Sequence, residues 1–96
     1  MSRVVFSPLA QADLDEILEY IARDKPQAAA SFVAKPKEKC YMLGRHPQLG
    51  ERRPEFKTGQ FRGFHVGNYV IFFRPADDGI EIARVVSGFR DLRYLF

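Results

Sequence analysis

The sequence has a single cysteine, Cys40, no tryptophan and two histidines, His46 and His65, that stand apart. One cysteine cannot form an internal disulfide, and no second cysteine is available to start a zinc motif, so neither is expected. No stretch approaches the roughly 20 apolar residues of a membrane-spanning helix. The N-terminus also lacks the apolar region and cleavage site of a signal peptide. We therefore expect a cytoplasmic protein with no metal, no cofactor and no membrane partner.

The sequence also lacks the usual catalytic motifs. It has no GxSxG, no phosphate-binding glycine loop, no HExxH and no paired cysteines. Cys40 falls on the apolar side of a predicted helix, which favours a packing role. Asp13 and Glu16 are three positions apart on another helix, a spacing that is ordinary for a solvated helix face. We expect no catalytic residue among them.

The sequence has enough apolar residues to form a core, and its excess of basic residues is unevenly distributed. The 96 residues are 46% hydrophobic and 14% aromatic, which favours one folded domain over residues 1–96. Residues 1–51 carry seven Lys/Arg and seven Asp/Glu, whereas residues 52–96 carry eight Lys/Arg and five Asp/Glu, a balance of +3. This bias favours an anionic partner, either a nucleic acid or an acidic protein segment. The alternative is a soluble surface that is basic without a partner.

The first elements predicted are a short strand, Arg3 to Phe6, and a helix that starts at Ser7-Pro8. Serine caps the free N–H groups of a first turn, and proline suits that turn because it needs no N–H there. Apolar residues then recur at i, i+3, i+4 and i+7, which indicates one buried stripe. The stripe consists of Leu14, Ile17, Leu18 and Ile21, and the acidic side opposite it of Asp13, Asp15, Glu16 and Glu19.

A second helix is predicted from Asp24-Lys25-Pro26 to a stop at Gly44. Pro36 lies in its middle, where proline removes a backbone hydrogen bond and collides with the preceding turn at a cost of about 3 kcal/mol. The helix must kink or split into two pieces, and we expect a kink near residues 32–36 because the flanking pattern stays helical. The apolar side of this helix consists of Phe32, Val33, Cys40 and Leu43.

After a predicted loop, three strands complete the chain. The loop covers residues 45–59 and the strands 60–66, 69–74 and 80–87, with hairpin turns at Gly67-Asn68 and Asp77-Asp78-Gly79. The order is β-α-α-β-β-β. Two helices joined by about four residues form an antiparallel hairpin. We therefore predict an α+β fold, in which an antiparallel sheet packs against an α-helical hairpin.

Arginines recur along these strands and give the clearest functional signal. Strand alternation predicts that Arg84 shares a face with Ile80, Ile82 and Val86. A guanidinium in such surroundings either pairs with a carboxylate or lines a cationic site that grips phosphate or carboxylate. Both alternatives stay open. The strand and tail arginines are Arg62, Arg74, Arg84 and Arg90, and the tail adds Tyr94 and Phe96, which either cover the sheet or anchor a partner.

Four segments give the sequence a family resemblance. They are "SPLAQADLDEILEYIA", "LGRHPQLGERRPEF", "FRGFHVGNYVIFFRPADDGIEIARVV" and "SGFRDLRYLF". In this order, over nearly the whole chain, the sequence resembles the ParE toxins of the RelE/ParE superfamily, the toxins of bacterial type II toxin–antitoxin systems. The resemblance implies the same β-α-α-β-β-β fold, poisoning of DNA gyrase, a block of replication, and neutralisation by a ParD-type antitoxin in a hetero-oligomer. It implies no sequence-specific nucleic-acid binding by the toxin alone.

The resemblance also implies site residues. An antitoxin segment would wrap the helical hairpin and the sheet, and the positions expected to receive it are Leu14, Ile17, Ile21, Phe32, Leu43, Arg62, Arg74 and Arg84. The positions expected to serve toxicity are Arg62, Arg84, Arg90, Tyr94 and Phe96. Ser87 stands where many relatives have histidine, and Pro36 where they usually have leucine.

Two alternatives remain. A RelE-like toxin would cleave mRNA on the ribosome, using Arg62 and Arg84 to stabilise phosphate charge and Tyr94 for proton transfer. Lys57 is the one counterpart here of the lysines in such sites. An inactive module that only binds an antitoxin would tolerate loss of the arginines.

Overall fold

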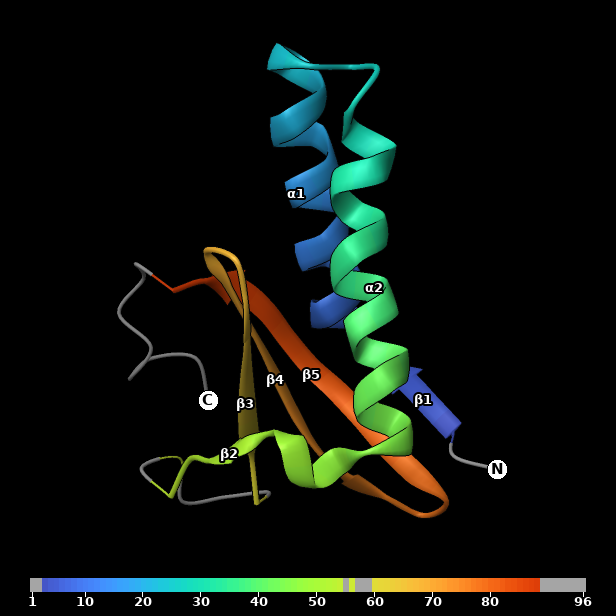
Figure 1. Cartoon of the computed structure of the whole chain (residues 1–96), viewed down its shortest axis with the longest axis vertical. Helices are drawn as coiled ribbons and strands as arrows, with labels where there is room; N and C mark the ends of the chain where they lie inside the picture. Colours follow the sequence, from blue (N-terminus) through green and yellow to red (C-terminus); the bar gives the residue numbers. More distant parts are fainter. Residues whose placement is uncertain (1–2, 55, 57–59, 89–96) are drawn as a thin grey trace.

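The structure is a computed structural model of the whole chain, and it describes residues 3–54, 56 and 60–88. Arg90, Tyr94 and Phe96, three of the predicted toxicity residues, lie outside the described part. The elements are β1 (Arg3–Phe6), α1 (Pro8–Asp24), α2 (Ala29–Arg45), a 3-10 turn (Pro47–Leu49), β2 (Glu51–Arg52), β3 (Arg62–Val66), β4 (Tyr69–Ala76) and β5 (Gly79–Ser87). Figure 1 shows the two helices as a hairpin that rises from the sheet.

The predicted α+β fold is confirmed, with two corrections to the sheet. The strand order is β1-β5-β4-β3-β2, and β1 pairs parallel to β5, so the sheet is mixed rather than antiparallel. Two parallel strands need a long connection between them. The connection from β1 to β5 is long enough because it contains the helical hairpin and three strands. The second correction is β2, a two-residue strand inside the segment predicted as loop, which pairs with β3.

Ser7 starts α1 as its sequence predicts. Its hydroxyl accepts a hydrogen bond from the Ala10 N–H at 3.0 Å and donates one to the Ala83 carbonyl at 2.8 Å. Pro8 occupies the first helical turn. The serine therefore caps the helix and also ties its start to β5, 76 residues later in the chain.

The second helix begins at Ala29, after four residues of connection, and it continues through Pro36. Splitting into two pieces, one of the two alternatives above, is thus wrong, and a kink near residues 32–36 stays a prediction. The start was placed too early because Ala28, the residue before the helix, offers no side-chain cap that a sequence pattern reveals. The Pro36 ring is buried, so part of its backbone cost is offset by packing.

Both faces of the sheet carry apolar clusters. Alternate residues of one strand point to opposite faces, so Ile71 and Phe73 lie under the helices while Val70 and Phe72 face the other way. The helix-side cluster consists of Ala10, Leu14, Ile17, Cys40, Leu43, Ile71, Phe73, Ile80, Ile82 and Val85. The far-side cluster consists of Phe56, Phe61, Val70, Phe72, Ala83 and Val86. Phe56 and Phe61, from the chain between β2 and β3, therefore cover the sheet face opposite the helices.

Replacing Pro36 with alanine restores an N–H donor to the middle of α2 and removes the ring that crowds the preceding turn. We expect the free energy of unfolding, measured by urea titration, to rise by up to about 3 kcal/mol. The exposed neighbour Lys35 is the matched control, and Lys35→Ala should change it by less than about 0.5 kcal/mol. A Pro36→Ala protein less stable than the parent would mean that ring packing outweighs the backbone term.

Candidate functional site

A bulge in β5 decides where its arginine points. Ile82 pairs with Phe73 and Arg84 pairs with Phe72, so Ala83 is an extra residue between two register positions of β4. A bulge of this kind shifts the alternation of side chains by one residue. Arg84 therefore lies opposite Phe72, on the face of Val86 and away from Ile80 and Ile82. The sequence-based prediction that it shares a face with all three residues is confirmed for Val86 and wrong for the two isoleucines.

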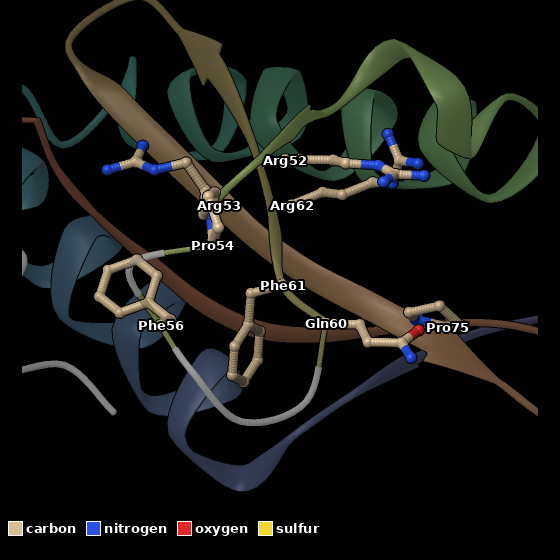
Figure 2. A pocket seen from close by; sticks show the side chains of 8 residues that line it. All are labelled: Arg52, Arg53, Pro54, Phe56, Gln60, Phe61, Arg62 and Pro75. Atoms are coloured by element: carbon tan, nitrogen blue, oxygen red, sulfur yellow. The ribbon is translucent and has the colours of Figure 1, made fainter.

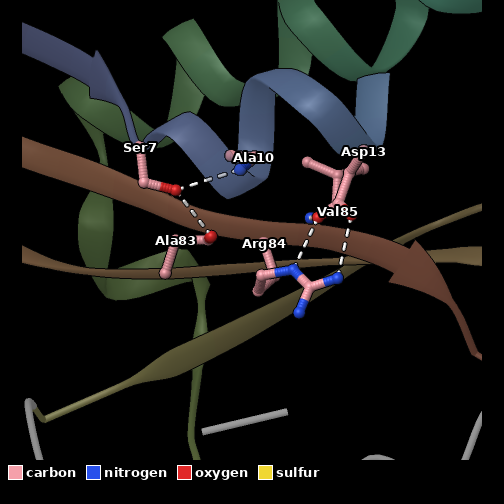
Figure 3. Close-up of polar contacts among 6 residues, drawn as sticks. All are labelled: Ser7, Ala10, Asp13, Ala83, Arg84 and Val85. Atoms are coloured by element: carbon pink, nitrogen blue, oxygen red, sulfur yellow. Dashed lines mark hydrogen bonds and ion pairs between the residues drawn. The ribbon is translucent and has the colours of Figure 1, made fainter. Parts of the chain in front are cut away.

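Beyond this bulge, α1 replaces β1 as the neighbour of β5. The register of β1 ends with Phe6 opposite Ile82, which leaves the next backbone groups of β5 without a strand partner on that side. The Ser7 hydroxyl bonds the Ala83 carbonyl, and the Asp13 carboxylate accepts a hydrogen bond from the Val85 N–H at 2.9 Å. The capping residue of α1 and one side chain of the helix itself thus continue the hydrogen bonding that β1 begins (Figure 3).

The same carboxylate binds Arg84 through two parallel hydrogen bonds. Arg84 Nε lies 2.8 Å from Asp13 Oδ2, and Nη2 lies 2.9 Å from Oδ1. The two side chains are 15% and 7% exposed, respectively. These hydrogen bonds, which Arg84 donates to Asp13, raise the pKa of Arg84 above its ordinary value, so the guanidinium is a fixed cation. Asp13, assigned from the sequence to the acidic side of the helix, is instead buried at the junction of helix and sheet.

Arg74 is paired as well. It lies directly opposite Glu81 in the β4–β5 register, and its Nε approaches Glu81 Oε1 to 2.8 Å. Its guanidinium also lies 5.6 Å from the centre of the Phe61 ring, within the range of a cation–π contact. The structure thus assigns Arg74 and Arg84 to structural ion pairs, one of the two readings that the sequence left open.

Three other arginines line a groove of about 460 Å³ beside β2 and β3 (Figure 2). Arg62 donates from Nη1 to the Gly50 carbonyl at 2.9 Å. Arg53 lies over the rings of Phe56 and Phe72, with 5.6 and 5.3 Å to their centres. The described residues that line the groove are Arg52, Arg53, Pro54, Phe56, Gln60, Phe61, Arg62 and Pro75. Sequence reasoning found Arg62 alone, although the pair Arg52-Arg53 within "ERRPEF" is a visible signal.

The family of the chain is decided by a match to a family model. The model described as "ParE toxin of type II toxin-antitoxin system, parDE" matches residues 4–92. The chain belongs to the ParE toxin family. Among solved structures, one from a chromosomal ParDE toxin–antitoxin system of P. aeruginosa has a TM-score of 0.76 at 24% sequence identity, over 91% of this chain and 96% of that one. That likeness concerns the fold. A search of curated proteins finds no match.

Several residues that were predicted to contact an antitoxin lie in the hydrophobic core of the ParE fold. Leu14, Ile17 and Leu43 are 1%, 8% and 0% exposed, so they have almost no surface to offer a partner. They were chosen as one helical stripe, and that stripe packs against the sheet. Ile21 is partly buried at the edge of the same cluster. Phe32 belongs to α2, but its side chain lies outside the described part.

This ParE family member has a second groove on its surface, beside α1. A groove of about 340 Å³ runs between α1 and the ends of β4 and β5, and its lining includes Glu16, Glu19, Tyr20 and Tyr69. The Tyr20 side chain is 72% exposed, the highest fraction among the exposed large apolar residues. This groove borders the Asp13–Arg84 pair, so the position of α1 against β5 sets its shape.

The described residues offer neither a reactive thiol nor a cluster of metal ligands. Burial raises the pKa of Cys40 to about 12, which keeps the thiol protonated and inert near neutral pH, as expected for a packing residue. Within the described ranges, no three His, Cys, Asp or Glu side chains gather as a metal site would require. None of the helices described is long and apolar enough to cross a membrane.

The energy of the Asp13–Arg84 pair can be isolated with a double-mutant cycle. Asp13→Ala leaves a largely buried guanidinium unpaired, so we expect it to lower the free energy of unfolding by about 3–5 kcal/mol. Arg84→Met removes the charge and keeps the aliphatic length. The double variant should be more stable than the sum of the single losses predicts, by about 1–3 kcal/mol, in urea unfolding. Additive losses would mean that the two side chains do not interact.

Proposed function

We propose that this ParE family member inhibits DNA gyrase, blocks replication in the bacterial cytoplasm, and is neutralised by a ParD-type antitoxin. The match to the ParE family over residues 4–92 carries the proposal. Membership makes the chain the toxin of a type II system, which has an antitoxin partner. Two parts of the proposal go beyond family membership: the ParD type of the antitoxin and gyrase as the target.

The antitoxin segment would contact surface side chains that surround the core rather than the core itself. Ile21, at the rim of the helix-side cluster, and Tyr20 beside it offer apolar surface next to the groove between α1 and the sheet. Arg62 is only partly buried and offers a cationic contact on the sheet, whereas Arg74, predicted for the same role, already pairs with Glu81. A wrapping segment that combines an apolar helix with acidic residues fits this distribution.

For toxicity, the arginines divide into two roles. Arg84 has a positioning role: it helps to hold α1 against β5, because its guanidinium is bound to Asp13 and its side chain is largely buried. Arg62 is partly exposed, donates a hydrogen bond to the Gly50 carbonyl, and can contact a target directly. We assign the remaining direct contacts to Arg90, Tyr94 and Phe96, which lie outside the described residues.

One observation disfavours the RelE-like alternative. An endoribonuclease needs cations that reach the reacting phosphate and stabilise charge as it develops. Arg84, the strand arginine predicted for that role, directs its guanidinium to Asp13 with two hydrogen bonds. Recruiting it to phosphate would leave the Asp13 carboxylate buried without its cation.

The test is a gyrase supercoiling assay with purified protein, run beside an mRNA cleavage assay on translating ribosomes. We expect loss of supercoiling or accumulation of cleaved DNA, with mRNA intact. Deleting residues 92–96 should reduce gyrase inhibition by at least about tenfold, a loss of about 1.4 kcal/mol of interaction. Arg23→Gln, an exposed change at the end of α1, is the control and should leave inhibition unchanged.

Two results would contradict this proposal. A folded protein that leaves gyrase untouched and cuts mRNA would be a ribosome-dependent nuclease. A folded protein silent in both assays would be an antitoxin-binding module. Circular dichroism of each variant separates loss of function from loss of fold.

A further inference from the structure

Two arginines face each other across the β2–β3 ladder. Arg52 lies directly opposite Arg62 in the antiparallel register, and Figure 2 shows their guanidinium groups beside one another. Both side chains are on the helix-side face of the sheet, because Arg62 in turn pairs with Phe73 of the helix-side cluster. Like charges at directly opposed positions destabilise a strand pair, and β2 is only two residues long. The contact between β2 and β3 therefore contains an internal repulsion.

No carboxylate within the described part of the chain neutralises this pair. Arg62 donates to the Gly50 carbonyl, a neutral acceptor, at 2.9 Å. Arg74 and Arg84, by contrast, each bind a carboxylate. Arg53 is separate from the pair, because its guanidinium lies against aromatic rings on the opposite face of the sheet. A carboxylate that reached the pair from a partner would turn the repulsion into attraction.

The outer side of β2 has backbone groups available to a further strand. The Arg53 N–H donates to the Phe61 carbonyl at 3.0 Å, toward β3. Successive residues of a paired strand direct their backbone groups alternately to its two sides, so the N–H and C=O of Arg52 point away from β3. Among the described residues, the strand order ends at β2. An extended polypeptide that paired here would place a side chain opposite Arg52, on the same face of the sheet.

We propose that β2 receives an extended, acidic polypeptide segment as a further strand, with a carboxylate opposite Arg52 that neutralises the Arg52–Arg62 pair. The guanidinium of Arg52 can hold a carboxylate through two parallel hydrogen bonds. Backbone pairing supplies affinity in this mode of recognition, and the side chain at the paired position supplies specificity.

The edge geometry selects a polypeptide over other anions. Phosphate, free or in a nucleic acid, also binds guanidinium groups, but it offers no N–H and C=O pair to match the backbone of Arg52. The inference rests on the proposed function and deepens it, because an antitoxin segment with acidic residues is the partner that would supply such a strand. It names the chemistry of one contact that this segment makes.

The test is an NMR titration of the full chain with a short capped peptide in which threonine and glutamate alternate. We expect saturable shifts of the Arg52 and Arg62 resonances, and slower hydrogen exchange of the Arg52 amide because its N–H gains an acceptor. A matched peptide with glutamine in place of glutamate should bind about tenfold more weakly, since it lacks the charge-assisted hydrogen bonds. A peptide with N-methylated glutamates keeps the charges but loses donors of the strand, so it should also bind about tenfold more weakly.

Two variants of Arg52 separate loss of binding from loss of fold. Arg52→Gln removes the repulsion, so it should raise the urea midpoint of the free protein and weaken peptide binding by about tenfold. Arg52→Glu places a carboxylate opposite Arg62, so it should raise the midpoint further and abolish peptide binding. Arg23→Gln removes an equal charge at the far end of α1, and it should change neither quantity.

Equal weakening by Arg23→Gln and Arg52→Gln would overturn the proposal, because net charge alone would then explain binding. Undiminished binding of the N-methylated peptide would also overturn it, since strand pairing would have no role. Inorganic phosphate that shifts the same resonances equally, at equal concentration, would make this a site for free anions instead. A lower urea midpoint for Arg52→Glu would remove the premise that the two guanidiniums repel one another.

This titration contains no gyrase, so its failure is distinguishable from failure of the proposed function. Gyrase inhibition by a protein that does not bind the peptide would refute this inference alone. Peptide binding by a protein that leaves gyrase untouched would refute the gyrase part of the proposed function alone.

Discussion

The Asp13 carboxylate is the contact on which the arrangement of helix and sheet depends. It accepts hydrogen bonds from the Arg84 guanidinium and from the Val85 N–H, at a point where β5 has lost its neighbouring strand. An N–H left unpaired at such a buried edge costs about 1–3 kcal/mol, and an unpaired buried guanidinium costs more. One side chain of α1 therefore satisfies both groups and fixes the helix against the bulged part of β5 (Figure 3).

This contact also determines which arginines are available for function. With Arg84 committed to Asp13 and Arg74 to Glu81, the arginines of the described strands that have no carboxylate partner among the described residues are Arg3 on β1 and the facing pair Arg52 and Arg62 at the other edge. The side of the molecule near α1 instead presents an acidic and aromatic groove. The ParE fold here thus has two surfaces of different character: an acidic and apolar one beside α1, suited to a partner helix, and a basic one at the β2–β3 edge of the sheet.

Local signals were sufficient to predict most elements. Ser7-Pro8 marked the start of α1, and Asp77-Asp78-Gly79 marked the turn between β4 and β5, because capping and turn chemistry act over a few residues. The features that were predicted wrongly are those that depend on contacts between distant parts of the sequence. The parallel partner of β1, the bulge at Ala83 and the short strand β2 depend on pairing between distant segments, and no local pattern in the sequence records them. The error at Arg84 follows from the bulge, since one extra residue reverses the predicted face.

The candidate site was harder to predict than the fold for the same reason. Leu14 and Leu43 were placed on a binding surface because an apolar stripe looks alike whether it meets a partner or the chain's own sheet. Arg52 was overlooked because its neighbour across the ladder, Arg62, becomes visible only with the β2–β3 register. Family resemblance gave the toxin class, but it could not sort the arginines into structural and free ones.

The most direct test of the central claim is hydrogen exchange of the Val85 amide, measured by NMR. The variant that combines Asp13→Ala with Arg84→Met removes the acceptor without leaving a buried charge behind. We predict that Val85 exchanges about tenfold to a hundredfold faster in this variant, as expected for a lost hydrogen bond to a charged group of about 1.5–3 kcal/mol. The Arg53 amide, which donates to the Phe61 carbonyl, should keep its protection. Unchanged exchange at Val85 would contradict the account, because the edge of β5 would then be closed by something other than Asp13.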